Sequence, residues 1–212
     1  MVKESSYVNL ISRLSVSLKA HDFRKKGDAF FLSGAVWGTI WFRPDRKYKL
    51  PEGQTKFTAE VYLTSQDLLD VFAKNYYRFE PVVIPPKISH LSRRLGHFAG
   101  FTLDHWWTIE QKNEIDVIQE IMTAVERGAV PFLRSNMSEE AILSSWLTDF
   151  NAARGNLSIP ELQGLCYLCH KLKRMKEFSD IRSFLESKYG QRTCDDQQTT
   201  VLDFLKRYDC KS

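Results

Sequence analysis

A Cys-x-x-Cys-His run at Cys166, Cys169 and His170 has the most chemically suggestive spacing in the sequence. Two thiols followed by a histidine are typical of covalent c-type haem attachment, and thiolates and imidazole are also the usual ligands of zinc. Cys194 and Cys210 could complete a zinc site, although they stand apart on separate segments. The first two cysteines also share a helical stripe with several leucines, which is typical of buried core thiols. We expect core packing here and no cofactor.

Three histidines, His90, His97 and His105, lie in a stretch rich in β-forming residues. With Asp104 or Glu60 they could assemble a metal site or an acid–base site. Their spacing matches no recognised ligand pattern, and His105 falls on the apolar side of an alternating segment, as core histidines do. They remain candidates for a hydrolytic or nucleic-acid-processing enzyme, and we assign no catalytic or metal-binding residue.

A basic loop containing Arg43, Arg46 and Lys47 follows a run that includes Trp37 and Trp41. Cations that meet phosphates beside aromatic rings that stack on bases would make a nucleic-acid surface. A charged hairpin loop is also an ordinary solvated loop that discourages edge pairing. The formal net charge of +4 over 212 residues is far below that of a dedicated nucleic-acid binder, so we do not favour nucleic acid as the partner.

Several common classes are disfavoured by what the sequence lacks. It has no G-x-G-x-x-G, P-loop or G-x-S-x-G motif, which argues against the usual nucleotide-dependent and serine-hydrolase chemistries. Residues 1–6 contain no basic segment leading into an apolar run, and no stretch approaches the roughly 18 apolar residues of a membrane span. We therefore expect a cytoplasmic protein with reduced thiols and no membrane association.

The elements that would position these residues change character along the chain. Helical spacing of apolar residues predicts an amphipathic helix over about 5–20. A Gly-Asp turn, an apolar run at 35–42 and alternation at 57–63 then predict an antiparallel meander, with 35–42 as a central strand covered on both sides. Ser65 is expected to cap a short helix, and further strands are expected near 89–98 and 101–109. A helix beginning near Asn113 should end at Gly128 and Pro131.

From Ser138 onward the sequence is helical in period throughout. A serine followed by two glutamates predicts one helix start, and the run Ser158 to Glu161 is a capping-box pattern that predicts another. Two further helices are expected over 177–189 and 198–208. The fold class is therefore α+β, an antiparallel sheet flanked by helices and followed by a C-terminal helical bundle. We expect a sheet domain at 1–134 and a helical appendage at 135–212.

Four short runs carry a family resemblance. They are residues 23–31 (FRKKGDAFF), Arg94-Leu95, Trp106-Trp107 and Pro131-Phe132-Leu133, in this order after an N-terminal helix. Over about residues 5–134 this order resembles the bacterial domain-of-unknown-function family 4304. The resemblance implies an α+β fold and a bacterial source, and it implies no activity, cofactor or site residue.

These observations favour a non-enzymatic module that binds another protein, with an immunity or antitoxin-like protein as one instance. The alternative is the enzyme that uses the sheet histidines. Convergence of His90, His97 and His105 in one cleft would support the enzyme, and a stable protein partner would support the binding module. Fold alone decides neither function.

Overall fold

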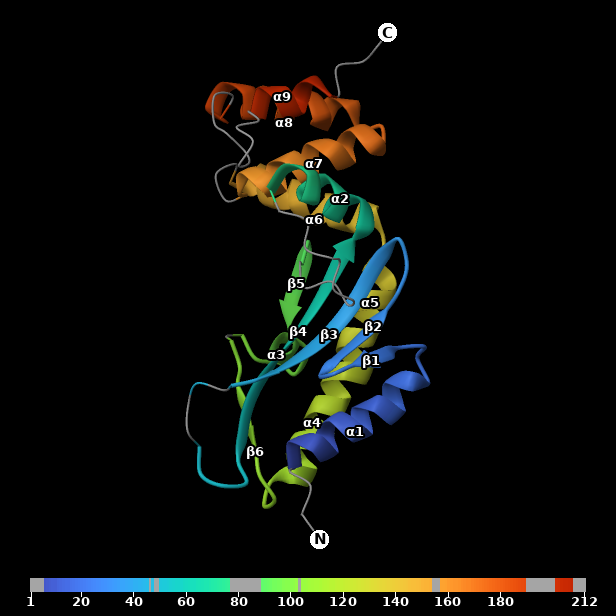
Figure 1. Cartoon of the computed structure of the whole chain (residues 1–212), viewed down its shortest axis with the longest axis vertical. Helices are drawn as coiled ribbons and strands as arrows, with labels where there is room; N and C mark the ends of the chain where they lie inside the picture. Colours follow the sequence, from blue (N-terminus) through green and yellow to red (C-terminus); the bar gives the residue numbers. More distant parts are fainter. Residues whose placement is uncertain are drawn as a thin grey trace. The chain divides into compact units, whose positions relative to one another are not determined.

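The computed structural model describes residues 6–45, 47, 50–76, 89–102, 104–153, 157–189 and 201–207, with residues 72–76 and 202 described by backbone alone. It contains an open antiparallel sheet and C-terminal helices, which confirms the α+β fold class (Figure 1). The strands are β1 (Arg24–Lys26), β2 (Ala29–Leu32), β3 (Val36–Pro44), β4 (Thr55–Ser65), β5 (Leu91–Arg94) and β6 (Trp107–Ile109). The helices are α1 (Ser6–Lys19), α2 (Gln66–Tyr76), α3 (Leu95–Phe98), α4 (Glu114–Ala124), the π-turn η1 (Val125–Ala129), α5 (Val130–Asn136), α6 (Glu139–Ala152), α7 (Ile159–Lys171), α8 (Met175–Tyr189) and α9 (Val201–Lys206).

The chain divides into two compact units, each built from two separate stretches. Unit 1 comprises Met1–Thr64 and Ile84–Met137, and unit 2 comprises Ser65–Val83 and Ser138–Ser212. The expected division after residue 134 placed α2 with the sheet, whereas α2 belongs to unit 2. The physical reason is that α2 packs against α7, and its Leu68 is fully buried.

The sheet of unit 1 has the strand order β1-β2-β3-β4-β5, and β6 also pairs with β4. Gly27 has φ +59° in the two-residue turn between β1 and β2, a conformation that glycine adopts without steric cost. β5 and β6 pair with different parts of the long strand β4, at residues 60–63 and 55–57. β4 is therefore the strand that organises the sheet.

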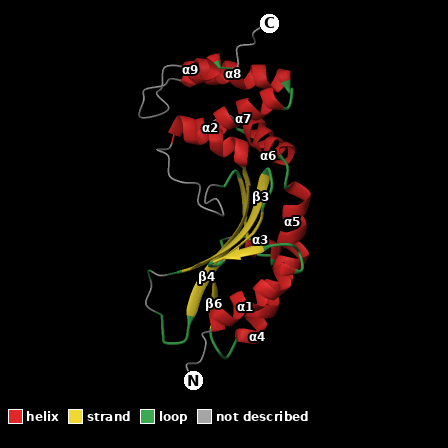
Figure 2. Ribbon diagram, turned by 45° about the vertical axis from the view of Figure 1, so that its right-hand side comes forward, coloured by secondary structure: helices red, strands yellow, loops and turns green. Residues whose placement is uncertain are grey.

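Helices α1, α4 and α5 lie along one side of this sheet (Figure 2). Phe57 of β4 contacts Tyr7 of α1 with ring centroids 5.3 Å apart, and Gly38 of β3 faces Leu133 of α5. Alternate residues on β3 and β4 that point to these helices are almost all fully buried. β3 is a central strand, as expected for residues 35–42. Among the described elements of unit 1 no helix covers the other side, where Thr39 is fully buried and Trp37 and Trp41 are half-buried, so the expected covering on both sides is only partial.

Two local predictions were wrong. Residues 95–98 form α3 rather than strand, because Gly100 has φ +89° and the chain turns back so that the amide of Phe101 bonds the carbonyl of Gly96. The helix beginning at Glu114 does not end at Gly128 but continues through η1 and α5 to Asn136. Pro131 has no amide hydrogen and its ring would clash with the carbonyl four residues earlier, and the wider π-turn accommodates it.

Unit 2 is helical in its described residues. Ser138 caps α6 by accepting a hydrogen bond from the amide of Ala141, and Ser158 and Glu161 form the predicted capping box of α7. The four expected tail helices are present as α6 to α9, with an apolar core from α2 and α6–α9. None of the helices that the structure describes is long and apolar enough to cross a membrane.

Candidate functional site

The Cys-x-x-Cys-His run lies on α7 with both thiols fully buried and free. Burial raises the pKa of Cys166 and of Cys169 to about 12, so neither is a thiolate at neutral pH. The His170 ring packs on Phe178 with centroids 5.5 Å apart. Cys194 and Cys210 lie outside the described residues, and within these no group of three or more His, Cys, Asp or Glu side chains could hold a metal. The two cysteines of the run therefore serve as core packing.

The three candidate histidines occupy different places in unit 1. His90 is buried before β5, and its amide bonds the carbonyl of Leu63. His105 stacks on Phe101 with centroids 3.6 Å apart, and its carbonyl accepts a hydrogen bond from Thr58. Leu63 and Thr58 are five residues apart on β4, which corresponds to roughly 16 Å along a strand.

His97 is exposed on α3, so the three rings do not meet in one described cluster. The two carboxylates that could have assisted them are engaged elsewhere. Glu60 lies 3.4 Å from the guanidinium of Arg43, and Asp104 lies 3.3 Å from Arg94. The structure thus brings the acidic candidates to arginines of the sheet rather than to histidines.

Arg43 belongs to the side of the sheet opposite the helices, which we call the open face. Strand register assigns its members: Lys26 is paired with Ala29, Ala29 with Trp41, and Glu60 with Arg94. The open face carries Arg24, Lys26, Phe31, Trp37, Thr39, Trp41, Arg43, Lys56, Thr58, Glu60, Tyr62 and Arg94, with Asp104 and Trp106 at its margin. Of these, Phe31, Thr39, Thr58 and Tyr62 are buried. Of the other basic-loop candidates, Lys47 is exposed with its amide bonded to Asp45, and Arg46 lies outside the described residues.

Two tryptophans of the open face carry a cation against the ring. The Arg43 guanidinium lies 5.0 Å from the Trp41 ring centroid, and the Lys56 ammonium lies 5.5 Å from that of Trp106. These distances are within the range of cation–π attraction. Trp37 stacks on Phe31 at 5.6 Å. The strands therefore hold large aromatic groups with fixed charges beside them.

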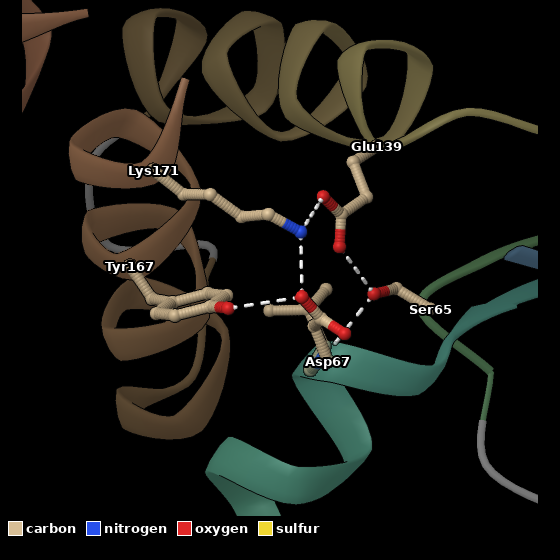
Figure 3. Close-up of polar contacts among 6 residues, drawn as sticks. Ser65, Asp67, Glu139, Tyr167 and Lys171 are labelled. Carbon is tan, nitrogen blue, oxygen red and sulfur yellow. Dashed lines mark hydrogen bonds and ion pairs between the residues drawn. The ribbon is translucent and has the colours of Figure 1, made fainter. Parts of the chain in front are cut away.

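Unit 2 contains a different polar cluster, formed by Ser65, Asp67, Glu139, Tyr167 and Lys171 and called here the Lys171 network (Figure 3). The Lys171 ammonium lies 2.5 Å from a carboxylate oxygen of Asp67 and 2.5 Å from one of Glu139. Tyr167 donates to Asp67 at 3.2 Å, and Ser65 donates to Glu139 at 2.8 Å. The network joins the start of α2, the start of α6 and the end of α7.

Its electrostatics are those of a permanent ion cluster. Burial alone would lower the pKa of Lys171, but the hydrogen bonds that it donates to Asp67 and Glu139 outweigh burial and raise the pKa. The hydrogen bond from Lys171 lowers the pKa of Asp67. A lysine base needs a depressed pKa, and Ser65 is fully buried with its hydroxyl accepting from the amide of Leu68. The network therefore fastens three helices and is not arranged for catalysis.

Sequence reasoning missed most of both sites. It identified Arg43 and the cap at Ser65, but it assigned Lys171 to no site. Arg24, Lys26 and Arg94 of the open face were not singled out, although alternation along the strands could have placed them. No family model matches the chain, and no curated protein or solved structure is significantly similar to it. The resemblance to family 4304 remains a prediction.

Proposed function

We propose that the chain is a non-enzymatic protein-binding module and that the open face is its binding surface. The observation that carries the proposal is the pairing of half-buried tryptophans with cations on a sheet side that no described helix of unit 1 covers. Tryptophan and arginine are enriched among the residues that dominate binding energy at protein interfaces. Rigid strands hold them in place, which lowers the entropy lost on binding.

A protein fits this surface better than a nucleic acid does. Glu60 and Asp104 lie within the charged row and compensate Arg43 and Arg94. Carboxylates in these positions would repel phosphates, whereas a protein surface can place both signs of charge opposite them. One face of the Trp41 ring is also already taken by Arg43, which leaves less of the ring for a stacked base.

An immunity or antitoxin-like protein in the bacterial cytoplasm is the instance that we favour. The resemblance to family 4304 supports a bacterial source. The thiols of Cys166 and Cys169 support a reducing compartment, because they fill the core of unit 2 as free side chains. Such a protein would bind its toxin in a stable stoichiometric complex, and co-expression with it would restore growth of a sensitive host.

The test combines capture with reconstitution. The tagged full chain is used to capture proteins from bacterial lysates, and a retained protein is then purified and titrated against the chain by calorimetry. We expect a stoichiometric complex that weakens by about 30-fold with Trp41→Ala or Arg43→Ala, equivalent to about 2 kcal/mol for an interface hot spot. Circular dichroism of each variant checks that the fold is retained.

Ile115→Ala is the matched control, because Ile115 is a large apolar side chain, 77% exposed, on α4 at the helical side of the sheet. It should leave affinity within about twofold. A complex that Trp41→Ala and Arg43→Ala leave intact would refute the open face as the binding surface. Turnover of a substrate by the purified chain would refute the non-enzymatic assignment.

A further inference from the structure

The open face is not uniform in charge. On its β4–β6 side, Arg94 pairs with Asp104 and Glu60 pairs with Arg43 at the end of β3, so positive and negative groups alternate. On its β1–β3 side, which we call the basic corner, the charged groups are Arg24 and Lys26, the half-buried aromatic groups are Trp37 and Trp41, and Phe31 and Thr39 are buried. The two sides therefore differ in what a partner would have to supply.

The cations of the basic corner have no carboxylate partner among the residues that the structure describes. Arg24 and Lys26 are exposed, and within the described part of the chain neither makes an ion pair. Asp28, in the adjacent turn, makes no described ion pair with either cation, and its backbone carbonyl accepts a hydrogen bond from the amide of Phe42. The basic corner thus carries two positive charges that no described carboxylate compensates.

The register fixes how these charges lie relative to the aromatic side chains. Lys26 pairs with Ala29 of β2, and Ala29 pairs with Trp41 of β3. The backbones of Lys26 and Trp41 are therefore two strand spacings, or about 10 Å, apart. Arg24 is level with Phe31, and Phe31 stacks on Trp37. A ligand that spans the corner would meet charge at one side and aromatic surface at the other.

We infer that the basic corner recognises an acidic segment of a protein partner, whose carboxylates pair with Arg24 and Lys26 while an apolar side chain packs against Trp41. The inference rests on the proposed function, because it names the chemistry of the partner of the same surface. Complementary charge increases the association rate and specificity, and the aromatic contact adds burial. The partner is thus a carboxylate-rich protein surface with an aromatic or aliphatic anchor.

Lys25 offers a matched control for this inference. It lies between Arg24 and Lys26, is equally exposed, and is paired with Phe30, so its strand position belongs to the helical side of the sheet. Arg24→Glu, Lys26→Glu and Lys25→Glu change net charge equally within one short strand. Only the first two alter the basic corner.

The experiment uses the full chain and three probes at low ionic strength: a random glutamate–tyrosine copolymer rich in glutamate, poly-L-glutamate, and single-stranded oligothymidylate. We expect the copolymer to bind most tightly, Arg24→Glu and Lys26→Glu as single variants each to weaken it by at least about tenfold, and the double variant to weaken it further. Lys25→Glu should weaken it by no more than about twofold. Added salt should reduce binding to the wild-type chain more than to the double variant.

Three results would overturn the inference. The first is that Lys25→Glu weakens copolymer binding as much as Arg24→Glu and Lys26→Glu do. The second is tighter binding of oligothymidylate than of the copolymer, which would assign the corner to nucleic acid. The third is equal binding of poly-L-glutamate and the copolymer, which would leave no role for Trp41. The proposed function is tested separately, by the binding of a captured partner. If a captured partner depends on Trp41 and Arg43 but not on Arg24 or Lys26, the binding module stands and the acidic-partner inference fails.

Discussion

His90 is a buried titratable side chain of the sheet unit, and it makes stability dependent on pH. Burial lowers its pKa to about 3, whereas an unfolded histidine titrates near about 6.5. Between these values the unfolded chain binds more protons than the folded chain, so this contribution to stability falls as the pH falls. The slope approaches about 1.4 kcal/mol per pH unit.

We therefore predict that His90→Gln reduces the loss of stability between about pH 6.5 and about pH 4.5. Urea unfolding at both pH values measures it, with His97→Gln as the control because His97 is exposed on α3. The prediction fails if the two variants and the wild-type chain lose the same free energy of unfolding over this interval.

At the level of residues, the sequence indicated which side chains could bind a partner, but not which residues they contact in the fold. Arg43 was recognisable as a cation beside an aromatic run, but its partner Glu60 is 17 residues away and becomes a neighbour only through strand pairing. His105 was expected to be a core histidine, and its ring stacks on Phe101, but the side chain is only partly buried. Pairings across β4 depend on register, which the local pattern of one strand does not specify.

Gly128 determines whether α3 can approach the π-turn. A Cβ at this position would lie 2.5 Å from the Cβ of Phe98, closer than side-chain flexibility can relieve. Alanine in place of a helical glycine normally stabilises by about 0.5–1 kcal/mol, whereas Gly128→Ala should destabilise by about 1–3 kcal/mol. Thermal unfolding distinguishes the two signs, and the neighbouring exposed Arg127→Ala is the control. A stabilised Gly128→Ala protein would show that α3 does not require this close approach.

Lys171 of α7 binds Asp67 of α2 and Glu139 of α6, and its removal should weaken both junctions. Lys171→Met leaves Asp67 without its cation and Glu139 charged in a position where its side chain is only 12% exposed. We predict a loss of about 1–2 kcal/mol in the free energy of unfolding. Lys176→Met, at an exposed position of α8, should cost little. Adding Glu139→Gln to Lys171→Met should recover part of the loss, and equal stability of the two lysine variants would refute the prediction.

Local periodicity predicted elements well where each element is stabilised by its own amphipathic pattern. The helix at 6–19 and the four tail helices follow their apolar spacing and their caps. It failed where tertiary contacts decide. The alternation over 101–106 belongs to a connection that packs against α3, and the consequence of Pro131 depended on whether the helix could widen into a π-turn rather than stop.

The division of the whole molecule into two units was the least accessible to sequence. The sequence is helical in period from Ser138 onward, and a boundary was predicted after residue 134, close to this change. Nothing local assigns α2 to the later helices, because its partners on α6 and α7 follow it by about seventy residues or more. A unit assembled from separated stretches of sequence cannot be predicted from local sequence patterns.

A fragment spanning residues 138–212 should fold poorly, although it contains four of the five described helices of unit 2. Without α2 it loses Leu68 from its core, the partner of Lys171 at Asp67, and the hydroxyl of Ser65 that bonds Glu139. Residues 65–83 joined to Ser138 by a flexible linker should restore a cooperative thermal transition in circular dichroism. The same linked fragment carrying Leu68→Asp should lose it again, because an unpaired carboxylate would replace a fully buried leucine. If the unlinked fragment unfolds at the same temperature as the linked one, α2 is dispensable and unit 2 begins at Ser138.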